Sequence, residues 1–157
     1  MRHTISVLVE NKFGVLARVA SLFSARGYNI ASLAVSETLD PAIAYWTLVV
    51  EAENEKILVQ INTQLNKLID VISVTDFTKK DHLDRELILA KVKLSLEEKE
   101  KLEAIFKKYV GKIIQHKGNA AIIEAVGDQA KIKQLLTELS KFGVKELVRT
   151  GRIAITH

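Results

Sequence analysis

Residues 3–10 read HTISVLVE and residues 15–26 read VLARVASLFSAR, and these two stretches set the architecture of the first half of the chain. In the first stretch Ile5, Val7 and Val9 occupy alternate positions, which predicts a strand with one apolar face. In the second stretch apolar residues recur at helical spacing and a glycine follows, which predicts a helix that ends there. A strand that leads directly into an amphipathic helix is the opening of a β-α-β-β-α-β unit.

The residues that follow complete this unit. Residues 29–38 and 43–51 have strand character and are joined through a turn at Asp40-Pro41. Asn54 is a suitable N-cap for a second amphipathic helix, and residues 71–77 are typical of a fourth strand. The first half therefore predicts four strands and two helices in the order β-α-β-β-α-β.

The second half repeats this order. Its expected elements are a strand over 87–94, a helix behind a capping box of Ser95 and Glu98, a hairpin of 113–116 and 120–125, a helix capped by Asp128, and a strand over 144–148 with 153–155 as a continuation. The sequence thus predicts the α+β class, as two tandem ferredoxin-like βαββαβ sandwiches with strand order 4-1-3-2. We expect domains over residues 1–78 and 87–157, joined by a polar linker over 79–86.

The second strand of the first unit lies at an edge of that predicted sheet. Residues 29–36 read NIASLAVS and contain no charged residue and no proline, which are the usual protections of an exposed edge. We expect the same strand of another copy to cover this edge, so the sequence predicts a homodimer with a continuous sheet.

Composition excludes several classes of protein. Of the 157 residues 48% are hydrophobic and 27% are charged, with a formal net charge of +4 and no cysteine. Residues 1–80 hold 8 basic and 8 acidic side chains, whereas residues 81–157 hold 15 and 11, an excess that a solvated helix face explains better than a nucleic-acid surface. No apolar run has the length of a membrane span and no signal-peptide core is evident, so we expect a cytoplasmic protein.

The loop between the first strand and the first helix is a candidate ligand site. Asn11 is a good N-cap residue, and Gly14 lets the backbone approach another group closely. The free amides of a helix start suit a carboxylate, and the side-chain carbonyl of Asn11 suits an ammonium group. Carboxylate and ammonium on adjacent atoms describe an amino acid, although from these residues alone an ordinary strand-to-helix turn is the favoured interpretation.

Several motifs in a fixed order add to this pattern. Asn11-x-x-Gly14 before a helix, and Arg26-Gly27-Tyr28-Asn29-Ile30 at the start of a strand, resemble the ACT domain. More narrowly, the chain resembles the small regulatory subunit of acetolactate synthase (acetohydroxyacid synthase). The matching segments cover almost the whole chain and are residues 6–11, 22–30, 64–71, 84–86, 111–114 and 149–151.

This resemblance implies a non-catalytic partner that activates a large catalytic subunit and makes it sensitive to a branched-chain amino acid, usually valine. Thiamine diphosphate, Mg²⁺ and FAD are expected in that large subunit, and no cofactor is expected in this chain. The implied effector site lies between two ACT domains of a dimer. Carried over by position, its residues are Asn11, Gly14, Val15 and Leu16 from one subunit and Asn29 and Ile30 from the other.

Two residues depart from the family pattern at this loop. Phe13 stands where relatives tend to have proline or a small residue, and Ala17 replaces a common hydroxyl. These departures leave the choice of amino acid and the strength of its binding open. The stoichiometry with the large subunit and the residues that contact it are open as well.

Other functions have less support. An RNA-binding module of the same topology would carry aromatic residues on its central strands, and the predicted first strands of both units have none. No nucleophile with a nearby histidine and acid is evident, and the four histidines show no metal-site spacing, so surface positions are expected for them. The remaining alternative is a free-standing tandem ACT sensor that regulates another enzyme or transcription.

Overall fold

The computed structural model describes residues 1–78 and 80–156. It divides into two compact units, one of which contains Met1–Leu83 and the segment from Arg152 onward, and the other Asp84–Gly151. Residue 79 of the expected linker and residue 157 of the expected second domain lie outside the described residues.

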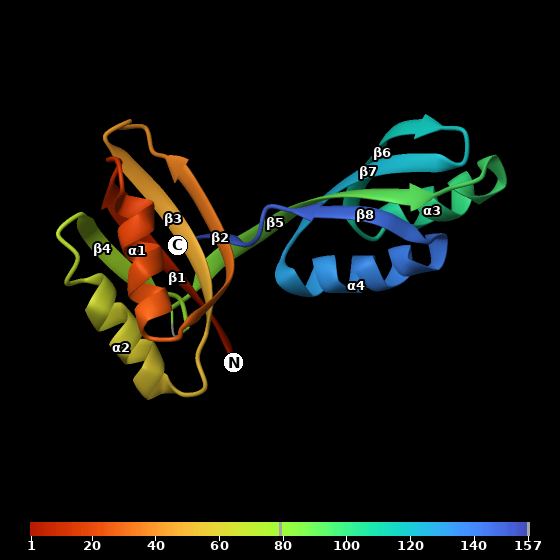
Figure 1. The fold of residues 1–157 in the computed structure, drawn as a ribbon. Coiled ribbons are helices and arrows are strands. Elements are labelled where there is room, and N and C mark those ends of the chain that lie inside the picture. The colour runs from red at the N-terminus through yellow and green to blue at the C-terminus, as the bar shows by residue number, and fades with distance from the viewer. Residues whose placement is uncertain (79, 157) are drawn as a thin grey trace. The chain divides into compact units, whose positions relative to one another are not determined.

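The first unit has the predicted order of strands and helices (Figure 1). Its elements are β1 (Arg2–Glu10), α1 (Val15–Ala25), β2 (Asn29–Glu37), β3 (Ile43–Glu51), α2 (Glu55–Leu65) and β4 (Val71–Asp76), with β9 (Ile153–Thr156) from the end of the chain. The antiparallel sheet has the order β2-β3-β1-β4, so the predicted order 4-1-3-2 is confirmed and β2 is an edge strand.

The core of the first unit lies between this sheet and its two helices, which cover one face of it (Figure 1). Alternate residues of β1 and β3 point into the core and are almost wholly buried, as their period of two predicts. The helices contribute their apolar stripes, and Asn54 caps α2 by accepting a hydrogen bond from the backbone N–H of Ile57 at 3.1 Å. The fully buried core side chains are Ile5, Val7, Val9, Leu48, Val50, Ile61 and Leu65.

The opposite face of the first sheet is covered by the end of the chain. Thr47 lies on that face and is only 2% exposed. The Tyr45 hydroxyl donates a hydrogen bond to the carbonyl oxygen of Ala154 at 2.8 Å, and Arg152 donates one to the Thr4 hydroxyl at 2.6 Å. The sequence predicts residues 152–157 in the second domain, whereas the described part of this segment, Arg152–Thr156, belongs to the first unit, where these polar groups on β1 and β3 bind it.

The second unit repeats the architecture. Its elements are β5 (His82–Lys93), the short 3₁₀ turn η1 (Leu96–Glu98), α3 (Lys99–Phe106), β6 (Val110–Lys117), β7 (Ala120–Gly127), α4 (Gln129–Leu139), the 3₁₀ turn η2 (Ser140–Phe142) and β8 (Val144–Arg149). The strand order is β6-β7-β5-β8, the same as in the first sheet, and β9 additionally pairs with β5. The capping box of Ser95 and Glu98 and the Asp128 cap of α4 are both present, which confirms these two local predictions.

The expected linker is partly a strand. His82–Glu86 form the beginning of β5, although the sequence analysis assigns residues 79–86 to a connection. The alternation of apolar and polar residues is not evident in this stretch, because the charged residue Glu86 occupies a buried position. Its charge is paired, since Arg149 donates hydrogen bonds to both of its carboxylate oxygens, at 2.7 and 2.8 Å. This bidentate pair raises the pKa of the Arg149 guanidinium.

Candidate functional site

Three loops meet at one end of the first unit, and the loop from Asn11 to Gly14 lies between the other two (Figure 1). The backbone N–H of Glu10 donates to the carbonyl oxygen of Asp70 at 2.9 Å, and that of Asn11 donates to Ala42 at 2.7 Å. These bonds fasten the loop to the α2–β4 connection on one side and to the β2–β3 hairpin on the other. The candidate site therefore rests on a fixed backbone frame.

Asn11 does not cap α1, which corrects the sequence analysis. Its side-chain amide donates to the carbonyl oxygen of Pro41 at 2.9 Å and to the carboxylate of Glu37 at 3.1 Å. The residue at the N-cap position is Gly14, whose φ of 81° is in the left-handed region that favours glycine. The hairpin turn competes for the asparagine side chain, so the first-turn amides of α1 receive no side-chain cap.

A guanidinium group lies beside the start of α1. A Cβ atom built on Gly14 would lie 3.3 Å from Nη1 of Arg18. The Arg18 Nε donates to the carboxylate of Asp70 at 2.7 Å, and the Asp70 side chain is only 9% exposed. α1 has no acidic residue in its first turn. The uncapped amides, the positive end of the helix dipole and Arg18 together make this position favourable for a carboxylate.

Val15 and Leu16 differ in what they offer a ligand. The Val15 side chain is 3% exposed and belongs to the core, so only its backbone faces the loop. Leu16 is 51% exposed, and the departing residue Phe13 is fully exposed at the loop tip. The nearby Lys12 ammonium is bound by Glu10 at 2.7 Å, a hydrogen bond that raises the pKa of Lys12.

Asn29 and Ile30 lie at the other end of the sheet. Asn29 is opposite Glu51 in the ladder between β2 and β3, and its side-chain amide donates to the Glu51 carboxylate at 2.7 Å. This hydrogen bond, together with Arg2, lowers the pKa of Glu51. Ile30 is partly buried and packs against the core.

The structure thus brings Asn11, Gly14, Val15 and Leu16 together and separates them from Asn29 and Ile30. The β2–β3 ladder runs from Asn29 opposite Glu51 to Glu37 opposite Ala44. At about 3.3 Å per residue, its two ends are roughly 26 Å apart. One amino acid is far too short to touch both groups within a single chain.

Three residues near the loop are absent from the sequence-based site. Arg18 is four residues after Gly14, and this helical spacing was the available signal for it. Glu37 and Asp70 carried no local signal, because their partners Asn11 and Arg18 are 26 and 52 residues away in the chain. Among the residues that the structure describes, histidines and acidic residues form no group of three suited to a metal ion. His3 is buried, contrary to the expected surface position, and its Nδ1 is 3.0 Å from the Thr78 hydroxyl.

The βαββαβ architecture of the first unit, with an uncapped helix start at one end of its sheet, is that of an ACT domain. Residues 5–73 match the family described as the AHAS small subunit-like ACT domain, and residues 85–157 match the family described as the small subunit of acetolactate synthase. The chain belongs to the acetolactate synthase small-subunit family.

Individual relatives agree over the whole chain. A probable acetolactate synthase small subunit of Archaeoglobus fulgidus is 41% identical over 99% of this chain and 96% of its own length. The chloroplastic acetolactate synthase small subunit 2 of Arabidopsis thaliana is 42% identical over 98% of this chain, which spans 32% of that longer protein. The crystal structure of the small subunit from Thermotoga maritima superposes with a TM-score of 0.88 at 34% identity, covering 100% of this chain and 98% of that one. Within the described residues no helix is long and apolar enough to span a bilayer.

Proposed function

We propose that this chain activates a catalytic acetolactate synthase large subunit and makes it sensitive to feedback inhibition by a branched-chain amino acid, with valine as the first candidate. Family membership supports the regulatory role. The observation that carries the allosteric part is the separation of Asn11 and Asn29 across the sheet, next to an edge strand that a second copy can pair with.

Pairing of two β2 strands closes this separation. Antiparallel pairing around a two-fold axis near Leu33, the middle residue of Asn29–Glu37, sets the first residue of one strand opposite the last residue of the other. Asn29 of the second copy then lies beside Glu37, the residue that Asn11 already binds. Each dimer holds two such sites, and every site takes its loop from one copy and its Asn29 from the other.

The chemistry of each half suits a part of the amino acid. The effector's carboxylate accepts hydrogen bonds from the backbone N–H groups at the start of α1 and faces Arg18. Its ammonium group lies near the Asn11 side chain and the Glu37 carboxylate. Its branched side chain contacts Leu16, which is half exposed, and Ile30 of the second copy.

The large subunit supplies the chemistry of acetolactate formation. In this proposal its thiamine diphosphate, Mg²⁺ and FAD stay there, and the small chain acts only through binding. The purified chain alone should therefore make no acetolactate from pyruvate, even with these cofactors added, and should raise the rate of its cognate large subunit. Turnover by the isolated chain, or no effect on the large subunit, would overturn the assignment.

Mixed dimers test the shared site directly. Gly14→Asp and Asn29→His are each expected to weaken valine inhibition strongly in their homodimers. When the two variants are refolded together, the mixed dimer regains one intact site, formed by the unchanged loop of one copy and the unchanged Asn29 of the other. About half of the refolded dimers are mixed, so partial inhibition by valine should return.

The matched control mixes Gly14→Asp with Asn11→Ala. Both changes are in the same loop, so every site in the mixed dimer keeps one damaged loop and no inhibition should return. Recovery in both mixtures, or in neither while both parent variants resist valine, would show that the site is not divided between two copies. Titration with valine, leucine and isoleucine then identifies the preferred effector.

A further inference from the structure

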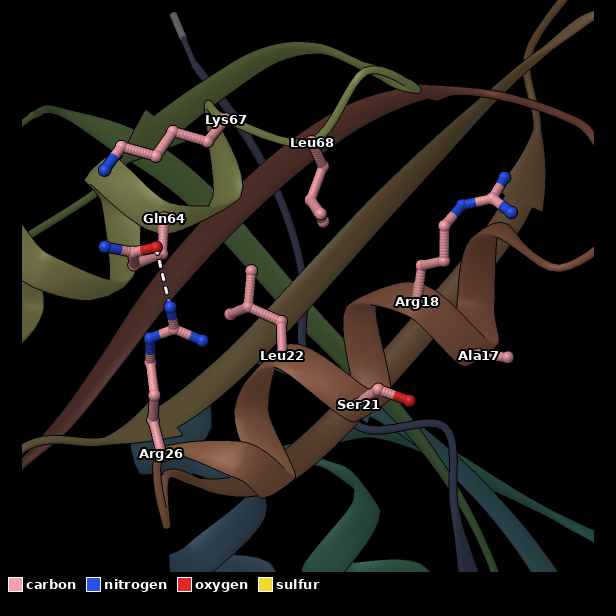
Figure 2. Close-up of a pocket in the computed structure, with 8 residues that line it drawn as sticks. All are labelled: Ala17, Arg18, Ser21, Leu22, Arg26, Gln64, Lys67 and Leu68. Atoms are coloured by element: carbon pink, nitrogen blue, oxygen red, sulfur yellow. Dashed lines mark hydrogen bonds between the residues drawn. The ribbon is translucent and has the colours of Figure 1, made fainter.

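A groove lies between α1 and α2 on the helical layer of the first unit. It encloses about 510 Å³ and is open to solvent, with Ala17, Arg18, Ser21, Leu22, Arg26, Gln64, Lys67 and Leu68 along its walls (Figure 2). None of these residues is among the sequence-predicted effector contacts. The groove runs between the two helices, whereas β2 is an edge strand of the sheet beneath, so pairing through β2 leaves the groove accessible.

The groove concentrates positive charge. Three of its eight lining residues are cationic and none is acidic, and within the described part of the chain only Arg18 of the three is paired with a carboxylate, that of Asp70 at 2.7 Å. This is a local excess, because residues 1–80 are balanced with 8 basic and 8 acidic side chains. Arg26 donates to the side-chain oxygen of Gln64 at 2.9 Å, which holds its guanidinium at the wall, and Lys67 is exposed.

The middle of the groove is apolar. Figure 2 shows Leu22 and Leu68 pointing toward one another, with Arg26, Gln64 and Lys67 to one side of them and Arg18 to the other. Leu22 is 9% exposed and Leu68 is partly buried against the core, so their exposed edges form the floor of the groove. A wide groove with an apolar centre and basic walls matches a protein segment that has acidic side chains around an apolar one, more than it matches a small free anion.

We propose that this groove is the docking site for an acidic, apolar-anchored segment of the large catalytic subunit; this rests on the proposed function. Arg18 connects the two sites, since it lines the groove and also lies beside Gly14 in the effector loop. Asp70 already binds the Arg18 Nε at 2.7 Å, so a carboxylate at the loop and an acidic segment in the groove would both draw on the terminal Nη groups of the same guanidinium. Their competition for Arg18 gives valine a route to weaken the productive contact with the large subunit.

Two variants change the groove without touching Arg18. Lys67→Glu reverses a cation at the wall, and Ser21→Glu adds a carboxylate on an exposed helical position where glutamate is a good helix former. Each has a control on the same helix and outside the groove, Lys56→Glu in α2 and Ser24→Glu in α1, both at exposed positions. The measured quantity is the concentration of small chain that gives half-maximal activation of the purified large subunit.

We expect this concentration to rise about tenfold for each groove variant and to stay within about twofold for each control. Rising NaCl should also weaken activation by the unmodified chain more than activation by Lys67→Glu, because screening acts on an attraction that the variant lacks. Circular dichroism of all four variants is the control for folding.

Equal activation by groove variants and controls would overturn the docking proposal while leaving the regulatory role intact. If the unmodified chain does not activate the large subunit at all, both proposals are wrong. If inorganic phosphate alone perturbs the amide resonances of the groove while the variants activate normally, the groove binds a small anion instead of the large subunit.

Discussion

Asn11 and Asn29 lie at opposite ends of one β-sheet, although the proposed effector site contains both. Asn11 binds the β2–β3 hairpin through Pro41, whereas Asn29 binds Glu51 at the far end of the same ladder. The proposed effector site needs both residues, and only a second copy of the chain can bring them together, so in this proposal the response to the effector depends on self-association. Loss of self-association should therefore remove feedback inhibition.

Two substitutions at Gly14 separate the effect of backbone strain on valine inhibition from the effect of an added charge. Because φ is 81°, any side chain there costs about 1 kcal/mol of strain, so Gly14→Ala should weaken valine inhibition modestly. Gly14→Asp adds a carboxylate beside Arg18, in the place proposed for the carboxylate of valine, and should raise the half-inhibitory concentration at least about tenfold. Steady-state assays with the large subunit measure both. Full inhibition of Gly14→Asp at the wild-type valine concentration would show that the effector binds elsewhere.

The hydrogen bond between Asn29 and Glu51 predicts a pH effect. In Asn29→Ala the pKa of Glu51 should rise toward its ordinary value, because Asn29 is the strongest cause of its lowering. A lowered carboxyl pKa stabilises the fold above about pH 4.3, and this contribution is lost as the pH falls through the folded-state pKa. The variant should therefore be less stable than the parent protein above about pH 4.3, and this difference should vanish as the pH falls through the lowered pKa of Glu51.

Carbon-detected NMR of the Glu51 carboxyl measures this shift. Asn66→Ala is the control, because the Asn66 side chain binds the carbonyl oxygen of Asn62 and does not contact Glu51. An unchanged Glu51 titration in Asn29→Ala would contradict the prediction.

The edge strand β2 offers one suitable position for testing self-association. Leu33 packs against the core, so a charge there would disturb folding, whereas Val35 is 48% exposed. Val35→Lys should weaken the dimer, since a two-fold axis brings two copies of the change to one interface. Val59→Lys on α2, at a position that is 61% exposed, serves as control. Sedimentation velocity distinguishes them, and an undiminished Val35→Lys dimer would mean that β2 is not the interface.

The buried carboxylate of Glu86 predicts a stability effect in the second unit. Glu86→Gln loses one of the two charge-assisted hydrogen bonds to Arg149 and should lower the free energy of unfolding by about 1–3 kcal/mol. Glu146→Gln removes the exposed pair with Lys91 and should change it by less than about 0.5 kcal/mol. Urea unfolding followed by circular dichroism compares the two. Similar losses would show that burial adds nothing to the Glu86 pair.

The contact between Tyr45 and Ala154 can be tested in the same way. Tyr45→Phe removes a 2.8 Å hydrogen bond that holds β9 on the sheet and should cost about 0.5–1.5 kcal/mol. In the control, Tyr28→Phe, the lost contact to Gln60 is long at 3.4 Å and exposed, so the cost should be smaller. Trp46, the one tryptophan of the chain, lies on β3 beside Tyr45 and reports unfolding of this unit by fluorescence.

The sequence by itself determined the elements and their order. Alternation and helical spacing located the strands and helices, and Asn54, Asp128 and the Ser95–Glu98 pair marked helix starts correctly. These signals are local, because a cap or an amphipathic face depends on residues within one or two turns. The edge position of β2 followed from the topology that this order implies.

Only the tertiary structure decided which side chains meet. Asn11 is a suitable cap by residue type, yet its side chain binds the hairpin turn at Pro41 instead. Glu86 was predicted to lie in a polar linker, whereas it lies inside a strand and is paired with Arg149. The last strand joined the first unit for the same reason, since Tyr45 and Thr4 bind it. Such partners are 30 to 148 residues apart in the chain, so their pairing depends on how the sheet is ordered and not on any local pattern. The basic groove between α1 and α2 likewise exists only because folding brings two helices, separated in sequence by two strands, against the same sheet face.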